Sequence, residues 1–244
     1  MGNKVIIGGM IKHSAYIQNG LLCVDLSIYR KDLRKDEDLT IYCQNRDLFK
    51  RALQEITEGN YFFTSDAMIQ TITYKRDKEF VCSECTYTKY ESVQSERTEV
   101  IFDDFQVIRV QQGQYIDGVN KVFVSGNICS QINYREKDGR YYTKYKLGVN
   151  QHTYSSQSAY PYIVSFGKEA ELAHKHLGLN SRVFVTGSIQ ERNVKQNKDF
   201  VCPECGTRAI KRTPVVVREV IVNDVLYIDK VGKEDKNNKE DGGI

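Results

Sequence analysis

The chain has 244 residues, of which 40% are hydrophobic and 27% charged, so it has room for one large domain or two of ordinary size and lacks the composition of a disordered chain. Its apolar stretches break within a few residues, far short of the roughly 20 that a membrane-spanning helix needs, and we expect no contact with a membrane. The net charge of +3 is a weak indication of a nucleic-acid partner, so the distribution of charge has to decide.

The start of the chain and its cysteines indicate the compartment. Residues 1–4 lead directly into an apolar strand-like run, with no signal segment or cleavage site, so we expect an intracellular, cytoplasmic protein. The seven cysteines are odd in number and include two Cys-x-x-Cys pairs, which suit metal binding or reduced thiols better than a disulfide framework. Cys23, Cys43 and Cys129 lie in strand-like runs and are expected to be small buried hydrophobic residues.

The sequence repeats itself at a spacing of about 120 residues. The run Phe-Val-Cys-Ser-Glu-Cys that starts at Phe80 returns as Phe-Val-Cys-Pro-Glu-Cys at Phe200. We therefore predict two copies of one domain, residues 1–110 and residues 120–230. A short polar linker at residues 111–119 joins them, and residues 231–244 form a disordered tail.

The predicted elements follow the same order in both copies. The first copy has a helix over residues 47–57, where Leu48, Ala52, Leu53 and Ile56 share a face, and a polar insert over residues 73–97. The second copy has strands at 121–132, 140–150, 158–166, 181–193 and 215–229, a helix at 169–177 that stops at Gly178, and an insert over residues 194–214. Three strands, a helix and two strands is the order of the OB-fold, although other small barrels share similar strand counts. The predicted class is all-β with a minor helix, as two tandem five-stranded OB-fold barrels with a Cys-x-x-Cys insert between the last two strands of each.

A series of short segments spans nearly the whole of residues 120–229. They are Asn120-Lys121-Val122 with Gly126-Asn127, Leu147-Gly148-Val149-Asn150, Phe166-Gly167-Lys168-Glu169-Ala170-Glu171, Gly187-Ser188-Ile189-Gln190-Glu191-Arg192 and Arg218-Glu219-Val220-Ile221-Val222. In these segments and their order, the second copy resembles the bacterial single-stranded DNA-binding protein family. The first copy resembles the family only through its similarity to the second. The family lacks the Cys-x-x-Cys insert, which suggests a variant from a phage or another mobile element, acting in a bacterial or phage-infected cell.

The resemblance implies a function and an assembly. It implies binding and protection of single-stranded DNA, without catalysis, during DNA replication, recombination or transfer. Because the family commonly assembles four OB domains, it also implies a homodimer of this two-copy chain. Family members often end in an acidic peptide that recruits replication and repair proteins. Here the tail mixes lysines with its acids, so an ordinary solvated tail is the simpler interpretation, and partners from replication or recombination stay an open alternative.

Aromatic and cationic residues lie on the same predicted strands of the second copy. Binding unpaired DNA without sequence preference needs cations along the phosphates and flat side chains on which bases stack. The resemblance places Tyr160 and Phe166 at stacking positions, with His152 and Tyr154 near a third. The full set of candidate DNA contacts is Tyr160, Phe166, Tyr154, His152, Tyr142, Lys144, Arg140, Arg192, Lys168, Tyr42, Arg30 and Tyr74. The alternative is that many of these tyrosines only fill strands and that the cations are ordinary solvated surface.

The two Cys-x-x-Cys pairs are candidate metal ligands. A structural zinc takes four ligands, and each insert supplies two cysteines and no histidine. The economical interpretation is one Zn²⁺ held by Cys82, Cys85, Cys202 and Cys205, with Gly206 permitting a positive φ after the second pair. Redox-active dithiols, two separate or intermolecular zinc sites, and simple structural turns remain alternatives. The redox alternative is disfavoured because neither pair starts a helix after a strand.

The sequence gives little sign of an enzyme. It has no phosphate-binding Gly-rich loop, no Gly-x-Ser-x-Gly and no His-Glu-x-x-His. The repeated acids Asp103-Asp104 and Asn223-Asp224 more simply mark a bulge or turn than a nuclease site, and we expect no catalytic residues. The remaining alternatives are an RNA-binding or replication-initiation accessory protein and a zinc-stabilised protein-interaction scaffold.

Overall fold

The computed structural model describes residues 2–31, 34–111, 113–114, 116–150 and 158–229. The twelve strands of this part of the chain form one sheet in the order β6-β4-β5-β3-β2-β1-β7-β11-β12-β10-β9-β8. The elements are β1 (Asn3–Gln18), β2 (Leu21–Arg30), β3 (Lys35–Cys43), η1 (Arg46–Leu48), α1 (Phe49–Glu55), β4 (Tyr61–Val81), β5 (Thr88–Phe102), β6 (Gln106–Ile108), β7 (Val119–Ile128), β8 (Asn133–Lys137), β9 (Arg140–Gly148), β10 (Tyr162–Phe166), α2 (Gly167–His176), β11 (Arg182–Val201) and β12 (Arg208–Asp229).

The strand pairings close two five-stranded barrels of the same topology. In the first barrel β1 pairs with both β2 and β4, and the parallel pairing of β3 with β5 closes the ring. In the second, β7 pairs with both β9 and β11, and the parallel pairing of β10 with β12 closes it. Three strands, a helix and two strands in each ring is the OB-fold order, so the prediction of an all-β fold with a minor helix and a closed five-stranded barrel is confirmed.

The helices lie where the sequence predicts them, with two differences at their edges. Ala52 and Ile56 are buried as expected, but Leu53 is exposed, so it does not share the core face of α1. The helix α2 ends at His176, and Leu177 in an extended conformation forms its C-cap instead of Gly178. No helix among the described residues is long and apolar enough to cross a membrane.

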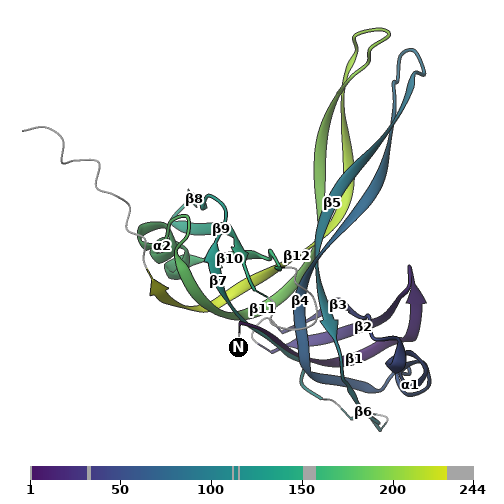
Figure 1. Cartoon of the computed structure of the whole chain (residues 1–244), viewed down its shortest axis with the longest axis vertical. Coiled ribbons are helices and arrows are strands. Elements are labelled where there is room, and N and C mark those ends of the chain that lie inside the picture. Colours follow the sequence, from purple (N-terminus) through teal and green to yellow (C-terminus); the bar gives the residue numbers. More distant parts are fainter. Residues whose placement is uncertain (1, 32–33, 112, 115, 151–157, 230–244) are drawn as a thin grey trace, which may run out of the picture.

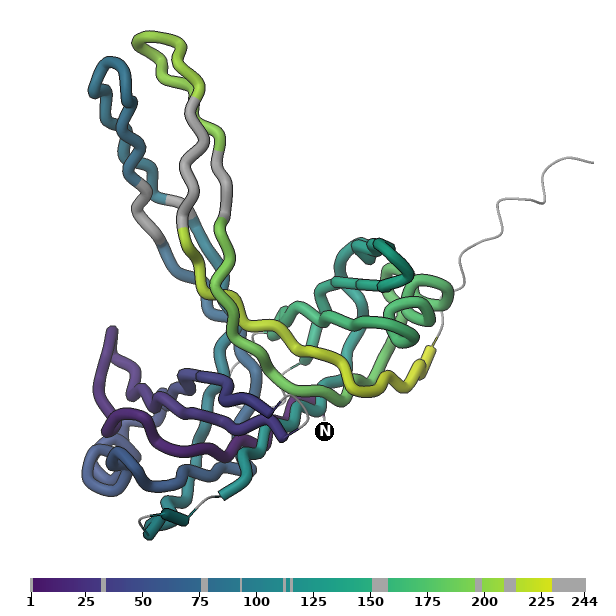
Figure 2. Tube along the Cα trace, turned by 180° about the vertical axis from the view of Figure 1, so that it is seen from behind, coloured from purple at the N-terminus to yellow at the C-terminus, as the bar shows by residue number. Residues whose placement is uncertain are grey.

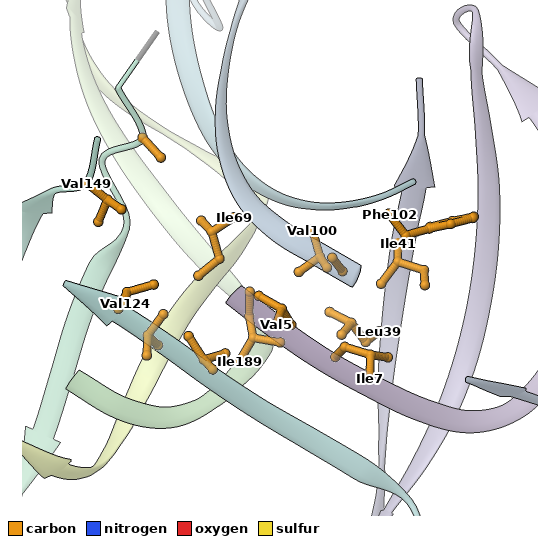
Figure 3. Packing of buried hydrophobic residues seen from close by; sticks show 14 of the residues in the cluster. Val5, Ile7, Leu39, Ile41, Ile69, Val100, Phe102, Val124, Val149 and Ile189 are labelled. Atoms are coloured by element: carbon orange, nitrogen blue, oxygen red, sulfur yellow. The ribbon is translucent and has the colours of Figure 1, made fainter. Parts of the chain in front are cut away.

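The two barrels share one sheet and one core. Along β1 and β7, residues 3–8 pair antiparallel with residues 119–124, so each barrel contributes one strand to the junction. Valines and isoleucines of both barrels belong to a single buried cluster. Figure 3 shows part of this cluster, with Val5 of β1 lying between side chains of the first barrel, such as Val100, and side chains of the second, such as Ile189.

Two long hairpins project from the barrels side by side (Figures 1 and 2). We call β4–β5 beyond the first barrel the first ribbon and β11–β12 beyond the second barrel the second ribbon. Their ladders continue without a break to Val81 opposite Thr88 and to Val201 opposite Arg208. The predicted inserts at residues 73–97 and 194–214 are therefore mostly strand. The sequence did not indicate this because a ribbon outside the barrel faces no core and so lacks the alternation of apolar residues that marks a strand.

Candidate nucleic-acid interface and metal centre

A groove of about 740 Å³ crosses the second barrel, lined by side chains of β8 to β12. Its aromatic residues are Tyr142, Tyr162 and Phe166, with the buried Tyr145 beneath them, and its cations are Arg135, Lys144 and Arg192. On each strand these residues are two or more positions apart, and the intervening residues, such as Thr143 and Ile163, are buried. The alternation of a half-buried strand thus aligns aromatic and cationic side chains on one face.

The aromatic rings of the groove are accessible. Phe166 is 56% exposed and Tyr162 37% exposed, whereas such rings in a folded domain are usually covered. The ring of Tyr142 lies 5.6 Å from that of Phe166 at an interplanar angle of 55°. Phe166 stays at the rim because Gly167 follows it with a φ of +58°, which turns the chain from β10 directly into α2. Tyr160, two residues before Tyr162, is 41% exposed.

A buried carboxylate fixes two of the groove cations. Lys144 Nζ donates to Glu219 Oε1 at 2.5 Å, and Arg192 donates from Nε to Oε2 at 2.7 Å and from Nη2 to Oε1 at 3.1 Å. Burial raises the pKa of Glu219, but the hydrogen bonds from Arg192 and Lys144 outweigh it, so the pKa lies below its ordinary value and the carboxyl is charged at neutral pH. Lys144 Nζ also lies 4.0 Å from the centre of the Tyr162 ring, a cation–π distance.

The structure brings some of the sequence-predicted contacts together and separates others. Tyr142, Lys144, Phe166 and Arg192 all line the groove. Tyr160, Arg140 and Lys168 are exposed but lie outside the groove lining, and His152 and Tyr154 fall outside the described residues. Among the groove residues that the candidate set lacked are Arg135, Tyr162 and Glu219. The sequence offers a signal for Tyr162, because it lies in the predicted strand 158–166, two residues from the candidate Tyr160, whereas it offers none for Glu219.

The three candidates on the first barrel make contacts within the chain. Tyr42 is only 8% exposed, because the guanidinium groups of Arg97 and Arg218 both lie 5.5 Å from its ring centre. Arg30 of β2 pairs with Glu37 at 3.3 Å and donates to Ser188 Oγ of the second barrel at 3.0 Å. Tyr74 is partly buried, with the Arg97 guanidinium 5.6 Å from its ring centre. The prediction that Tyr42 offers an accessible stacking face does not fit its burial.

An ion-pair cluster covers the same face of the first barrel. Arg218, from the base of the second ribbon, pairs with the fully buried Glu99 of β5 and lies 2.6 Å from a Glu191 carboxylate oxygen. Arg97 also pairs with Glu99. Tyr42 pairs with Ile101 in the first barrel as Val164 pairs with Ile221 in the second, so Glu99 corresponds to Glu219. The carboxylate of Glu99 in the first barrel is thus paired with Arg218, which comes from the second barrel.

The four cysteines of the repeated motif meet at the tips of the two ribbons. The Sγ atoms of Cys82, Cys85, Cys202 and Cys205 all lie within 4.8 Å of one another. Two of these contacts, Cys82 to Cys205 and Cys85 to Cys202, measure 3.5 Å each and join one ribbon to the other. Below them the rings of Phe80 and Phe200 stack with centroids 5.3 Å apart.

Tight turns present the sulfurs to one another. The backbone N–H of Cys82 donates to the Tyr87 carbonyl, and that of Cys202 donates to the Thr207 carbonyl. Gly206 has a φ of +72°, as the motif predicts, and Thr86 adopts a φ of +59° at the corresponding place in the first copy. Outside the cluster Cys23 and Cys43 are buried, but Cys129 is exposed after the end of β7, so its predicted burial is wrong.

The close approach of the four sulfurs shifts the pKa values of their thiols in opposite directions. Hydrogen bonds to Thr207 lower the pKa of Cys205 to about 6. A hydrogen bond to the Tyr87 backbone lowers the pKa of Cys85, but the neighbouring thiols outweigh it and raise the pKa to about 12. A divalent cation removes this conflict, because it favours the thiolate at every ligand. Four sulfurs around one point fit tetrahedral thiolate coordination, in which sulfurs about 2.3 Å from zinc lie about 3.8 Å apart.

Comparison with known proteins finds a family match for the second barrel. Residues 119–221 match the family model described as the single-strand binding protein family. In this segment the second barrel is similar to members of that family. The match covers every residue of the groove lining and includes both Cys202 and Cys205, while the first barrel lies outside it. A comparison with curated proteins finds no match.

Solved structures share the fold of this chain over nearly its whole length. The crystal structure of wild-type single-stranded DNA binding protein from Thermus aquaticus aligns with a TM-score of 0.58 at 13% identity, covering 92% of this chain and 92% of that chain. A deletion and point-substitution variant of the Thermus aquaticus protein aligns with the same TM-score and identity, covering 95% of this chain and 97% of that chain. At this identity the likeness is one of fold alone.

Proposed function

We propose that the protein binds single-stranded DNA without sequence preference, through the groove of the second barrel, and has no catalytic role. The observation that carries this proposal is one groove in which the exposed rings of Tyr162 and Phe166 and the half-buried ring of Tyr142 lie beside cations. The barrel that carries this groove matches the single-strand binding protein family. Such a surface suits protection of unpaired strands during replication, recombination or transfer. It would act where unpaired DNA is exposed, in the cytoplasm of a bacterial or phage-infected cell.

The physical terms of binding follow from the groove. Each base that stacks on an aromatic ring contributes about 1–3 kcal/mol, and every base offers a flat face, so stacking does not select sequence. Lys144, Arg192 and Arg135 can each neutralise a phosphate and release condensed counterions. Affinity should therefore fall steeply as salt rises, with log K changing by about 0.7 per neutralised phosphate for each tenfold change in salt.

We assign the primary DNA site to the second barrel. In the first barrel the face that corresponds to the groove carries Cys23, Tyr42 and Ile101, all buried, and Arg218 of the second barrel lies over it. DNA could reach that face only by displacing the pairing of Arg218 with Glu99. On this view residues 1–110 form a domain that supports the assembly, and residues 120–230 form the domain that contacts DNA.

For the cysteine cluster we propose one structural Zn²⁺ held by all four thiolates. Its role would be to tie the tips of the two ribbons together. The inter-ribbon contacts Cys82–Cys205 and Cys85–Cys202 support a shared site over two separate ones, because each ribbon alone supplies only two sulfurs.

A homodimer is the assembly that the outer face of the sheet supports. Leu226 and Ile228 of β12 are 63% and 50% exposed, and Leu226 lies directly opposite the half-buried Phe184 of β11. Phe123 of β7 shares this face, because Ser125, two residues along, lies opposite Phe184. An apolar row that crosses three strands and faces away from the core is a suitable self-complementary surface for two-fold pairing. Two chains would then bring four barrels together.

The test is fluorescence anisotropy of labelled poly(dT), titrated with protein at two salt concentrations and with duplex DNA and RNA as competitors. The proposal predicts tight, salt-sensitive binding to the single strand that duplex competes for poorly. Equal competition by duplex, or no binding to poly(dT), would show that the barrel has kept its fold and lost this use.

A further inference from the structure

The groove contains a carboxylate, that of Glu219, bound to two of the cations that could hold a DNA phosphate. Glu219 is 2% exposed, and its two carboxylate oxygens accept three hydrogen bonds from Lys144 and Arg192. Arg192 donates hydrogen bonds from both Nε and Nη2 to this one carboxylate. The same paired donors are the ones that an arginine uses to bind a phosphate group.

We propose that Glu219 is an internal competitor of the DNA phosphates, which occupies Lys144 and Arg192 in the free protein and so lowers the affinity for single-stranded DNA. This inference rests on the proposed function. A phosphate oxygen that approaches either cation must share it with Glu219 or displace it. The carboxylate therefore sets how tightly the groove holds a strand and lets the protein release it.

The position of the two cations separates this role from a purely structural one. The side chains of Lys144 and Arg192 are 25% and 46% exposed, so both can be hydrated or bind an anion without Glu219. Glu99, the corresponding carboxylate in the first barrel, is fully buried, and its partner Arg218 is almost fully buried. That pair closes the junction between the barrels, whereas the Glu219 pairs open onto the groove.

The charge at Glu219 has a predictable effect on binding. Glu219→Gln keeps the shape and one accepting oxygen but removes one negative charge that lies within 3.1 Å of both cations. We expect the dissociation constant for poly(dT) to fall at least about fivefold at low salt, since a hydrogen bond between charged groups is worth about 1.5–3 kcal/mol. The slope of log K against log salt should steepen by about 0.7 for each phosphate that gains a cation.

The experiment measures poly(dT) affinity and salt slope for the wild type, Glu219→Gln and a matched control, Glu171→Gln. Glu171 pairs with Lys175 on the exposed surface of α2, so the control removes the same charge away from the groove. Tighter binding by Glu219→Gln and an unchanged affinity for Glu171→Gln support the proposal. If the wild type binds and Glu219→Gln binds equally or more weakly, Glu219 only positions the cations and the proposal is wrong, while the proposed function stands. If no variant binds, both are wrong.

A double-mutant cycle gives an independent reading. Because Lys144 is occupied in the wild type, Lys144→Gln should weaken binding only about twofold there, and at least about fivefold in the Glu219→Gln background. A loss of tenfold or more on Lys144→Gln alone would show that the lysine is already free for DNA. That single-variant measurement decides the question even if Glu219→Gln does not fold.

Discussion

Truncation of Phe166 separates a role in binding from a role in folding. Phe166 is 56% exposed and its main ring neighbour is Tyr142, at 5.6 Å. Phe166→Ala should therefore cost only about 0.5–1.5 kcal/mol of folding stability, the value of one aromatic pair, and not the 3–5 kcal/mol of a buried phenylalanine. A lost base stack of about 1–3 kcal/mol should weaken binding about 5- to 150-fold.

The assay is poly(dT) anisotropy at low salt, with thermal denaturation followed by circular dichroism. Ile17→Ala is the matched control, because Ile17 is 52% exposed on β1 of the first barrel and lies away from the groove. It should leave the affinity unchanged. A change of less than twofold in the dissociation constant of a folded Phe166→Ala would refute the reasoning. It would show that no base stacks on the most exposed ring of the groove.

Three further predictions concern the metal, the barrel junction and the assembly, and a fourth concerns pH. Cys202→Ser should lose the bound zinc by elemental analysis, whereas Cys129→Ser, a substitution of the exposed cysteine outside the cluster, should retain it. Arg218→Ala removes one of the two cations that pair with the buried Glu99 and leaves only Arg97, so it should cost up to about 3–5 kcal/mol in urea denaturation. Leu226→Lys should convert a dimer to monomers in sedimentation equilibrium, because it places a charge in the apolar face. The pKa of Glu219 is lowered from 4.5 in the folded state, so its ion pairs should stabilise the fold at neutral pH and lose this effect as pH falls below 4.5. The difference in unfolding free energy between the wild type and Glu219→Gln, measured in urea from pH 7 to pH 3, should therefore shrink as the pH falls.

The barrels were predictable from sequence and the ribbons were not. Strands such as β9 and β11 alternate buried and exposed residues where they border a core, which gives the period of two that a sequence shows. Beyond the barrels the same strands lose that signal, so the polar inserts were predicted as interruptions. The helix α1 was predicted with one residue too many on its core face, because Leu53 has the right spacing but no neighbour to cover it.

Parts of the candidate site could likewise be predicted from sequence, and parts that depend on distant contacts could not. The repeat placed two cysteines in each copy, and the count of four predicted that the pairs would meet, as they do at the ribbon tips. Phe166 came from the resemblance and Arg192 from the candidate cations, and both lie in the groove. The burial of Tyr42 could not be predicted, because the residue that covers it, Arg218, lies 176 positions away. Glu219 was missed for a similar reason, since its role depends on cations from two other strands.

Photocrosslinking of poly(dT) to the protein, followed by mass spectrometry of the crosslinked peptides, tests the central claim most directly. Base adducts report which rings touch the strand, independently of affinity. The account predicts adducts within residues 140–148 and 158–168, on the strands that carry Tyr142, Tyr162 and Phe166. Adducts confined to residues 1–110, or a complete lack of adducts at a saturating concentration of protein, would contradict it.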